Sequence, residues 1–146
     1  MTITQHITAT VALAGEQSVS LDAHGTGGAG SLITVTVGSV AVWLHDRRAA
    51  NCYSQAWLDG VAAEARCYLP AAEKIRVGQS AACYPVLAVH ANGWDRHAAT
   101  YNPARHELVL AVGYLRWVVL DRTAYDVQAA AWRRVRDLAT VILPPH

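Results

Sequence analysis

The stretch LITVTVGSVAVWLH, residues 32–45, alternates between two kinds of side chain on either side of Gly38-Ser39. Successive side chains of a strand point to opposite faces, and a Gly-X pair is typical of a two-residue hairpin turn. Pairing the two arms leaves one face entirely apolar, formed by Ile33, Val35, Val37, Val40, Val42 and Leu44. The other face carries Thr34, Thr36, Ala41, Trp43 and His45. The stretch therefore predicts a hairpin that buries one face and presents Trp43 on the other.

The same pattern returns 75 residues later as ELVLAVGYLRWVVL, residues 107–120. Aligning the chain with itself at this offset superimposes a turn glycine, a helix start and a mid-helix tryptophan. The matched pairs are Val37-Gly38 with Val112-Gly113, Asp46-Arg47 with Asp121-Arg122, and Ala56-Trp57 with Ala131-Trp132. Because matches at one fixed offset are the signature of a repeat, the sequence predicts a tandem duplication.

Each copy is predicted to be a ββββα unit, which places the chain in the α+β class as two antiparallel four-stranded meanders, each followed by a helix. The second copy contains a hairpin signal at Asn92-Gly93 and a helix N-cap at Asp121. Its predicted elements are strands at 84–91, 94–101, 106–112 and 115–120 and a helix at 122–142. The first copy is expected to repeat this plan, with strands at 3–14, 18–24, 32–37 and 40–45 and a helix at 47–69.

These elements divide the chain into a first repeat (1–70), a linker (71–81) and a second repeat (82–146), which we expect to share one core around a pseudo-twofold axis. Trp57 and Trp132 occupy the same helical position in the two copies. We predict that both are core residues, because an amphipathic helix buries one stripe against its sheet. Gly60 weakens the first helix by about 1 kcal/mol relative to alanine, so packing must offset it or a neighbour must come close.

The composition indicates a soluble, compact protein that needs no membrane. Hydrophobic residues make up 53% of the chain, yet no apolar run reaches the roughly 20 residues that span a bilayer. No basic segment followed by an apolar one opens the sequence, so we expect a cytoplasmic location. Three cysteines without CxxC spacing are expected to be free thiols. Such an apolar chain favours a homo-oligomer that hides part of its surface.

Signatures of catalysis are missing from the sequence. The glycine-rich loop at 25–30 has no GxGxxG pattern and precedes a strand, so it predicts a flexible connection rather than a phosphate site. No nucleophile elbow, activated thiol or paired carboxylate stands out. We therefore expect a protein that is not an enzyme and needs no cofactor.

The seven histidines also fail to form a metal-binding pattern. Across the predicted Asn92-Gly93 hairpin, His90 would face Asp95 and His97 would face Ala88. These side chains would share a face without converging, whereas a metal site needs convergent ligands and a supporting shell. The sequence therefore predicts no bound metal.

A duplicated ββββα unit resembles the Whirly and PUR-repeat proteins, in which two such units pack sheet and helix together. The resemblance is one of topology and covers nearly the whole chain. It implies binding of single-stranded DNA or RNA.

Two functions therefore stay open. In the first, single-stranded nucleic acid crosses the sheet face of the first hairpin; the residues expected to contact it are Thr34, Thr36, Trp43, His45, Arg96, Arg105 and Arg116. In the second, the chain is a protein-interaction or assembly module that forms a homo-oligomer, most simply a twofold dimer; its expected interface is Val109, Val118 and Leu120.

Overall fold

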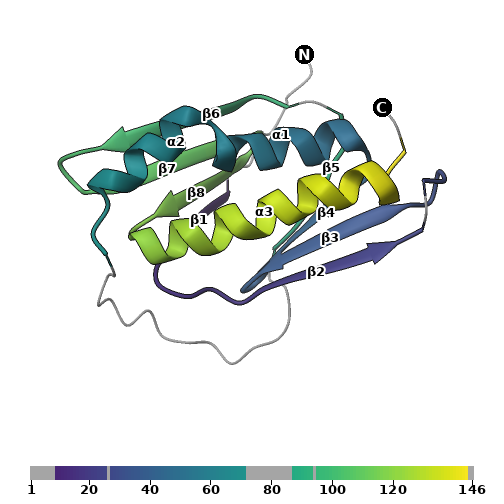
Figure 1. The fold of residues 1–146 in the computed structure, drawn as a ribbon, viewed down its shortest axis with the longest axis horizontal. Coiled ribbons are helices and arrows are strands. Elements are labelled where there is room, and N and C mark those ends of the chain that lie inside the picture. Colours follow the sequence, from purple (N-terminus) through teal and green to yellow (C-terminus); the bar gives the residue numbers. More distant parts are fainter. Residues whose placement is uncertain (1–8, 26, 72–86, 94, 145–146) are drawn as a thin grey trace, which may run out of the picture.

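The computed structural model describes residues 9–25, 27–71, 87–93 and 95–144. It is an α+β fold in which two four-stranded sheets carry a layer of helices (Figure 1). Most of the predicted linker, residues 72–81, lies outside the described residues, as do the predicted strand residues 3–8, 84–86 and 94.

The two hairpins form where the alternating patterns predict them. Strands β3 (Leu32–Val37) and β4 (Val40–Leu44) pair antiparallel around Gly38, with Thr34 opposite Trp43. Strands β7 (Glu107–Val112) and β8 (Leu115–Val119) pair in the same way around Gly113. Both glycines have positive φ angles, 56° and 58°, a backbone conformation that favours glycine. At Gly113 a side chain would also collide with the Asp95 carboxylate, because a Cβ there would overlap its Oδ2.

Each hairpin gains one antiparallel neighbour from its own half of the chain. Strand β2 (Val19–His24) pairs with β3, and β6 (His97–Asn102) pairs with β7. Each half thus supplies a three-stranded meander.

The fourth strand of each sheet comes from the other half, so the predicted four-stranded meanders are wrong. Strand β1 (Ala9–Leu13) lies parallel to β8, and β5 (Leu87–Ala91) lies parallel to β4. The sheet orders are β1-β8-β7-β6 and β2-β3-β4-β5. Asn92-Gly93 therefore does not join two paired strands, because β5 and β6 belong to different sheets. A turn signal fixes where the chain bends, whereas the partner of the strand is set by contacts distant in sequence.

Two aspartates start the helices that follow the hairpins. Asp46 caps α1 (Arg47–Leu58) and Asp121 caps α3 (Arg122–Ile142), each carboxylate accepting from a backbone N–H of the first turn. The predicted helix at 47–69 is broken at Asp59, whose backbone is extended, and continues as α2 (Gly60–Ala65) and the 3-10 turn η1 (Arg66–Tyr68). A Cβ added at Gly60 would meet no atom of another element within 4 Å, so the chain accommodates this glycine at a helix break and not by close packing.

The helices α1 and α3 lie side by side over both sheets (Figure 1). Helix α1 contacts β6 and β7 of the second half, while α3 contacts β2 and β3 of the first. One hydrophobic core with residues from both halves lies between helices and sheets. Trp57 and Trp132 are both 0% exposed, which confirms them as core residues. Their polar surroundings differ, since Trp132 Nε1 donates to Gln128 whereas Trp57 Nε1 has no partner among the described residues.

None of the described helices combines the length and apolar character needed to cross a membrane. Helices α1 and α3 pack on the inner faces of the two sheets. No described helix lies on the outer faces (Figure 1). Most of the predicted binding residues lie on these two outer faces.

Candidate functional site

The outer face of sheet β2-β3-β4-β5 displays a row of four side chains, one from each strand. Asp22 lies opposite Thr34, Thr34 opposite Trp43, and Trp43 beside His90. We call this surface the Trp43 face; its outward residues are Ser20, Asp22, His24, Leu32, Thr34, Thr36, Ala41, Trp43, His45, Ala88 and His90. The four residues predicted from the first hairpin, Thr34, Thr36, Trp43 and His45, all lie here.

Three aromatic rings gather on the Trp43 face. The Trp43 and His90 ring centroids are 4.5 Å apart with the planes at 70°, so the two rings meet edge to face. The His45 and His90 rings are nearly parallel, at 11°, with centroids 5.2 Å apart. His45 Nε2 and His90 Nδ1 are hydrogen-bonded at 2.9 Å. Trp43 is half-buried by its neighbours, and His90 is exposed.

His90 is a residue of this surface that the sequence analysis placed wrongly. The predicted hairpin put it opposite Asp95, whereas the parallel pairing of β5 with β4 puts it beside Trp43. Only the exchange of β5 between the halves brings these rings together. The sequence offers no local signal for that exchange.

The three predicted arginines do not join the Trp43 face. Arg116 is exposed on β8, in the other sheet, opposite Ala111. Arg105 is exposed, and its guanidinium lies 4.0 Å from the half-buried Glu107 carboxylate. Arg96 is exposed just before β6, and its carbonyl accepts from the Gly113 N–H. The predicted binding residues are therefore divided between the two sheets, with the aromatic group on one and the cations on the other.

The outer face of sheet β1-β8-β7-β6, which we call the Val118 face, has a small apolar centre. Val109 and Val118 are direct neighbours, and Ala12 and Thr100 flank them. Both valines are half-buried within one chain, and Leu120, beyond the end of β8, is half-buried too. The predicted interface residues thus lie together on one sheet.

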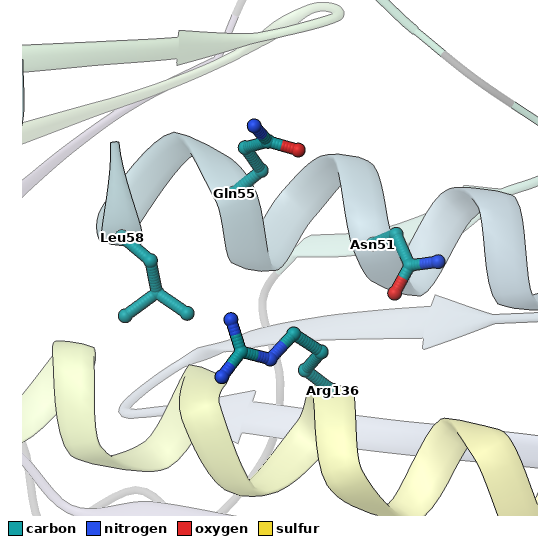
Figure 2. A pocket seen from close by; sticks show the side chains of 4 residues that line it. All are labelled: Asn51, Gln55, Leu58 and Arg136. Atoms are coloured by element: carbon teal, nitrogen blue, oxygen red, sulfur yellow. The ribbon is translucent and has the colours of Figure 1, made fainter. Parts of the chain in front are cut away.

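A shallow groove between the two long helices carries polar groups that the sequence analysis did not single out. It has a volume of about 360 Å³ and is lined by Asn51, Gln55, Leu58 and Arg136 (Figure 2). Arg133 and Arg134 are exposed beside Arg136 on α3. A guanidinium and two amides can donate hydrogen bonds to an anion. The sequence pattern of α3 indicates this basic surface, because Arg133, Arg134 and Arg136 all fall outside the buried positions of the helix.

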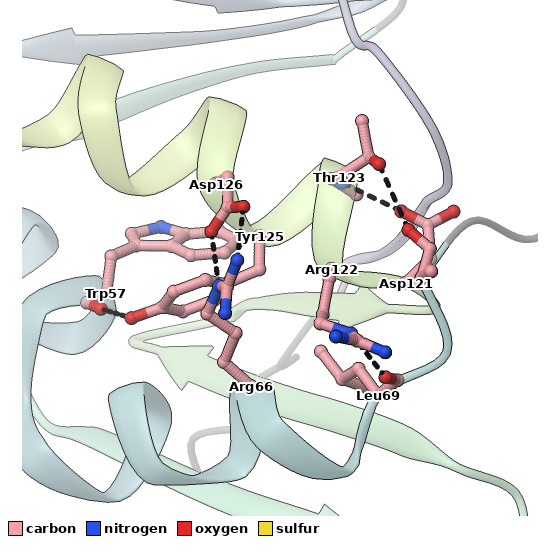
Figure 3. A network of polar contacts seen from close by, with 10 residues as sticks. Trp57, Arg66, Leu69, Asp121, Arg122, Thr123, Tyr125 and Asp126 are labelled. Atoms are coloured by element: carbon pink, nitrogen blue, oxygen red, sulfur yellow. Dashed lines mark hydrogen bonds and ion pairs between the residues drawn. The ribbon is translucent and has the colours of Figure 1, made fainter.

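The contacts drawn in Figure 3 tie the second half to the end of the first. Arg66 donates to both oxygens of Asp126 at 2.6 and 2.8 Å, and this guanidinium holds the pKa of the Asp126 carboxyl below its ordinary value. The Tyr125 hydroxyl donates to the Trp57 carbonyl at 2.8 Å, and burial raises the pKa of Tyr125. These groups hold helices together.

The described cysteines do not form a reactive centre. The Cys52 thiol is buried and donates to the Asp95 carbonyl at 2.9 Å. Burial raises its pKa, which disfavours the nucleophilic thiolate. The neighbouring Tyr53 is buried as well, which raises its pKa to about 12. Cys67 is exposed, and Cys83 lies outside the described residues.

Within the described part of the chain, no group of three or more His, Cys, Asp or Glu residues could hold a metal ion. The feature that distinguishes the described part of the molecule is therefore the Trp43 face, a sheet surface that no described helix covers and that carries three aromatic rings. Comparison with known proteins identifies no family for the chain, since no family model, curated protein or solved structure matches it.

Proposed function

We propose that this chain is a non-catalytic binding protein that holds single-stranded DNA or RNA on the Trp43 face. The observation that carries the proposal is the ring cluster of Trp43, His45 and His90 on a sheet that no described helix covers. Unstacked bases bind to such aromatic surfaces, and every base has a π-face to offer. The hydroxyls of Thr34 and Thr36, which are half-buried beside Trp43, can donate to phosphate or base oxygens.

The distribution of charge decides what kind of binding to expect. Among the described residues, the Trp43 face carries no arginine or lysine, and Asp22 adds a negative charge in the row of Trp43. Phosphate neutralisation is therefore weak on this surface, and stacking supplies most of the affinity. We expect modest affinity with little sequence preference. The arginines at 96, 105 and 116 contribute only if the strand continues onto the second sheet.

The finer fold proposal supports the same function. We infer a pseudo-twofold duplication of the Whirly and PUR-repeat kind, in which the two units have exchanged their first strands. Support comes from matched contacts, because Asp46 Oδ2 accepts from Gly93 N and Asp121 Oδ2 accepts from Gly15 N, at 2.7 and 2.8 Å. In this arrangement the Trp43 and Val118 faces are equivalent surfaces that have diverged, one towards aromatic and one towards aliphatic side chains.

Trp43→Ala is expected to weaken binding of a short labelled oligonucleotide by about tenfold, because stacking of one base contributes roughly 1–3 kcal/mol. Fluorescence polarisation at low salt measures this. Val118→Ala is the matched control, since Val118 holds the equivalent position on the other sheet, and it should leave binding unchanged. Wild-type protein that shows no polarisation change, or a Trp43→Ala variant that binds as wild type does, would rule the proposal out.

A second candidate, homodimer formation, rests on the apolar centre of the Val118 face. Protein interfaces exclude charge from their centres, and a twofold dimer places each patch against its own copy. The described centre of this face consists of Ala12, Ala98, Val109, Ala111 and Val118, with Arg116 and Glu107 on the same face beside it.

Val109→Arg is expected to convert a dimer into a monomer, because the new cations would face each other across the twofold axis. Light scattering gives the mass. The matched control is Thr34→Arg, which places the same charge at the equivalent position of the Trp43 face. A monomeric wild-type protein at high concentration would exclude this interface.

A further inference from the structure

We propose that His45 and His90 form a two-histidine site for a divalent transition-metal ion, preferentially Cu²⁺ and then Ni²⁺. The two rings come from parallel neighbouring strands, with His90 on β5 and His45 just beyond β4. Their facing nitrogens, Nε2 of His45 and Nδ1 of His90, are 2.9 Å apart. Imidazole nitrogen is a preferred ligand of both ions.

The nitrogen separation in the hydrogen-bonded pair is compatible with two ligands at a right angle. Metal–nitrogen bonds of about 2.0–2.1 Å place two ligands at a right angle about 2.9 Å apart, while a tetrahedral ion needs about 3.4 Å. The observed 2.9 Å therefore fits two adjacent corners of the square or octahedral arrangement that Cu²⁺ and Ni²⁺ adopt. Zn²⁺, which prefers tetrahedral ligands, fits less well. Affinity also follows the order Ni²⁺ below Cu²⁺ for a given set of nitrogen ligands.

The surroundings support ion access and ligand order. His90 is exposed and His45 is half-buried, so water can fill the remaining coordination positions. The described residues offer no third His, Cys, Asp or Glu close enough to complete a larger group. Trp43 contacts His90 edge to face at 4.5 Å and restricts the rotation of that ring. Such contacts around a ligand orient it for the metal.

Binding requires no net loss of a proton. In the metal-free pair one ring donates its N–H to the other, so one of the two facing nitrogens carries a proton. When the ion binds, that ring keeps its proton on the other nitrogen, which points away from the ion. Both facing lone pairs are then free to coordinate the metal. The site shares His45 and His90 with the proposed nucleic-acid surface, but it needs only these two imidazoles and water, so metal binding can be tested in the absence of nucleic acid.

Trp43 supplies the readout, since a paramagnetic Cu²⁺ ion beside His90 quenches the fluorescence of the adjacent indole. Titration of the full chain with Cu²⁺ should give saturable quenching at one ion per chain. The electron paramagnetic resonance spectrum of the complex should show two nitrogen ligands. His90→Ala and His45→Ala should each weaken binding by about tenfold or more, because each removes one of only two protein ligands. His24→Ala, at the far strand of the same face, is the matched control and should bind as wild type does.

A second measurement is needed, because a local structural change could also lower the Trp43 fluorescence without metal binding at the two histidines. The bound ion links β4 to β5, and only the folded chain holds His45 and His90 together, so saturating Ni²⁺ should raise the midpoint of thermal unfolding of wild type more than that of His90→Ala. The proposal is overturned if the wild type shows no saturable binding, or if binding survives in His45→Ala and His90→Ala with unchanged affinity. In the first case the two histidines are only a hydrogen-bonded pair, and in the second the ion sits elsewhere on the chain.

Discussion

Replacing Trp57 with alanine should lower the free energy of unfolding by about 3–5 kcal/mol, the range found when a large aromatic side chain is removed from a core. Trp57 is 0% exposed and packs against Trp117 and Tyr125, with ring centroids 6.0 and 6.2 Å away. Its neighbours come from α3 and from β8, so the cavity would open between the two halves of the molecule. Urea titration followed by far-ultraviolet circular dichroism measures the change.

Two other variants show whether burial is the cause. Trp43→Ala removes the same side chain from a half-buried surface position and should lower stability by only about 1 kcal/mol, the size of one aromatic pair contact. Trp57→Phe keeps most of the volume and loses an Nε1 that has no partner among the described residues, so it should be milder than Trp57→Ala. If Trp57→Ala and Trp43→Ala were equally stable, the assignment of Trp57 to the core would be wrong.

Asp121→Ala should lower the free energy of unfolding by about 2–4 kcal/mol, because it combines two losses. One carboxylate oxygen accepts from Ala124 N at 2.7 Å and caps α3, and the other accepts from Gly15 N at 2.8 Å beyond the end of β1. Asp121 is 0% exposed, so water cannot replace both bonds. The same denaturant titration reports the effect.

The aspartate that begins α1 provides the comparison. Asp46 makes the same two kinds of bond, to Ala49 N and Gly93 N, but it is half-buried and water can reach it. Asp46→Ala should therefore be the milder substitution of the two. Asp121→Asn retains a capping oxygen and turns an amide N–H₂ towards Gly15 N, so it should fall between wild type and Asp121→Ala. Equal losses in all three variants would show that burial of the carboxylate is unimportant.

Features that depend on neighbouring residues could be predicted from the sequence. The hairpin registers follow from alternation around Gly38 and Gly113, and the helix starts follow from two capping aspartates. The break at Asp59 was missed, because glycine in a helix gives only a small penalty and the outcome depends on packing. The exchange of β1 and β5 was missed for a stronger reason. An edge strand with one apolar face fits either sheet equally well, and only the complete core distinguishes them.

The candidate site shows the same division. Trp43 and its threonine neighbours share a hairpin, so their common face could be predicted from alternation alone. His90 reaches them through a parallel pairing between halves, and no spacing in the sequence marks it. The arginines at 96, 105 and 116 were grouped with Trp43 by charge, whereas Arg116 lies on β8 of the other sheet and Arg96 and Arg105 lie in the connections before and after β6. The chemical type of a residue identifies it as a candidate for binding, but the long-range strand pairing determines which candidates lie close together.

The exchange of first strands also constrains the order in which the molecule can be completed. The bond between Gly15 and Asp121 joins residues 106 positions apart, and β1 has no described partner other than β8. During synthesis β1 must therefore wait on the ribosome or beyond it, unpaired, until almost all of the described chain has emerged. Contacts of such long range slow folding, and an unpaired strand is a site where chains associate wrongly. The sheet that contains β1 is therefore complete only once β8 is available to pair with it.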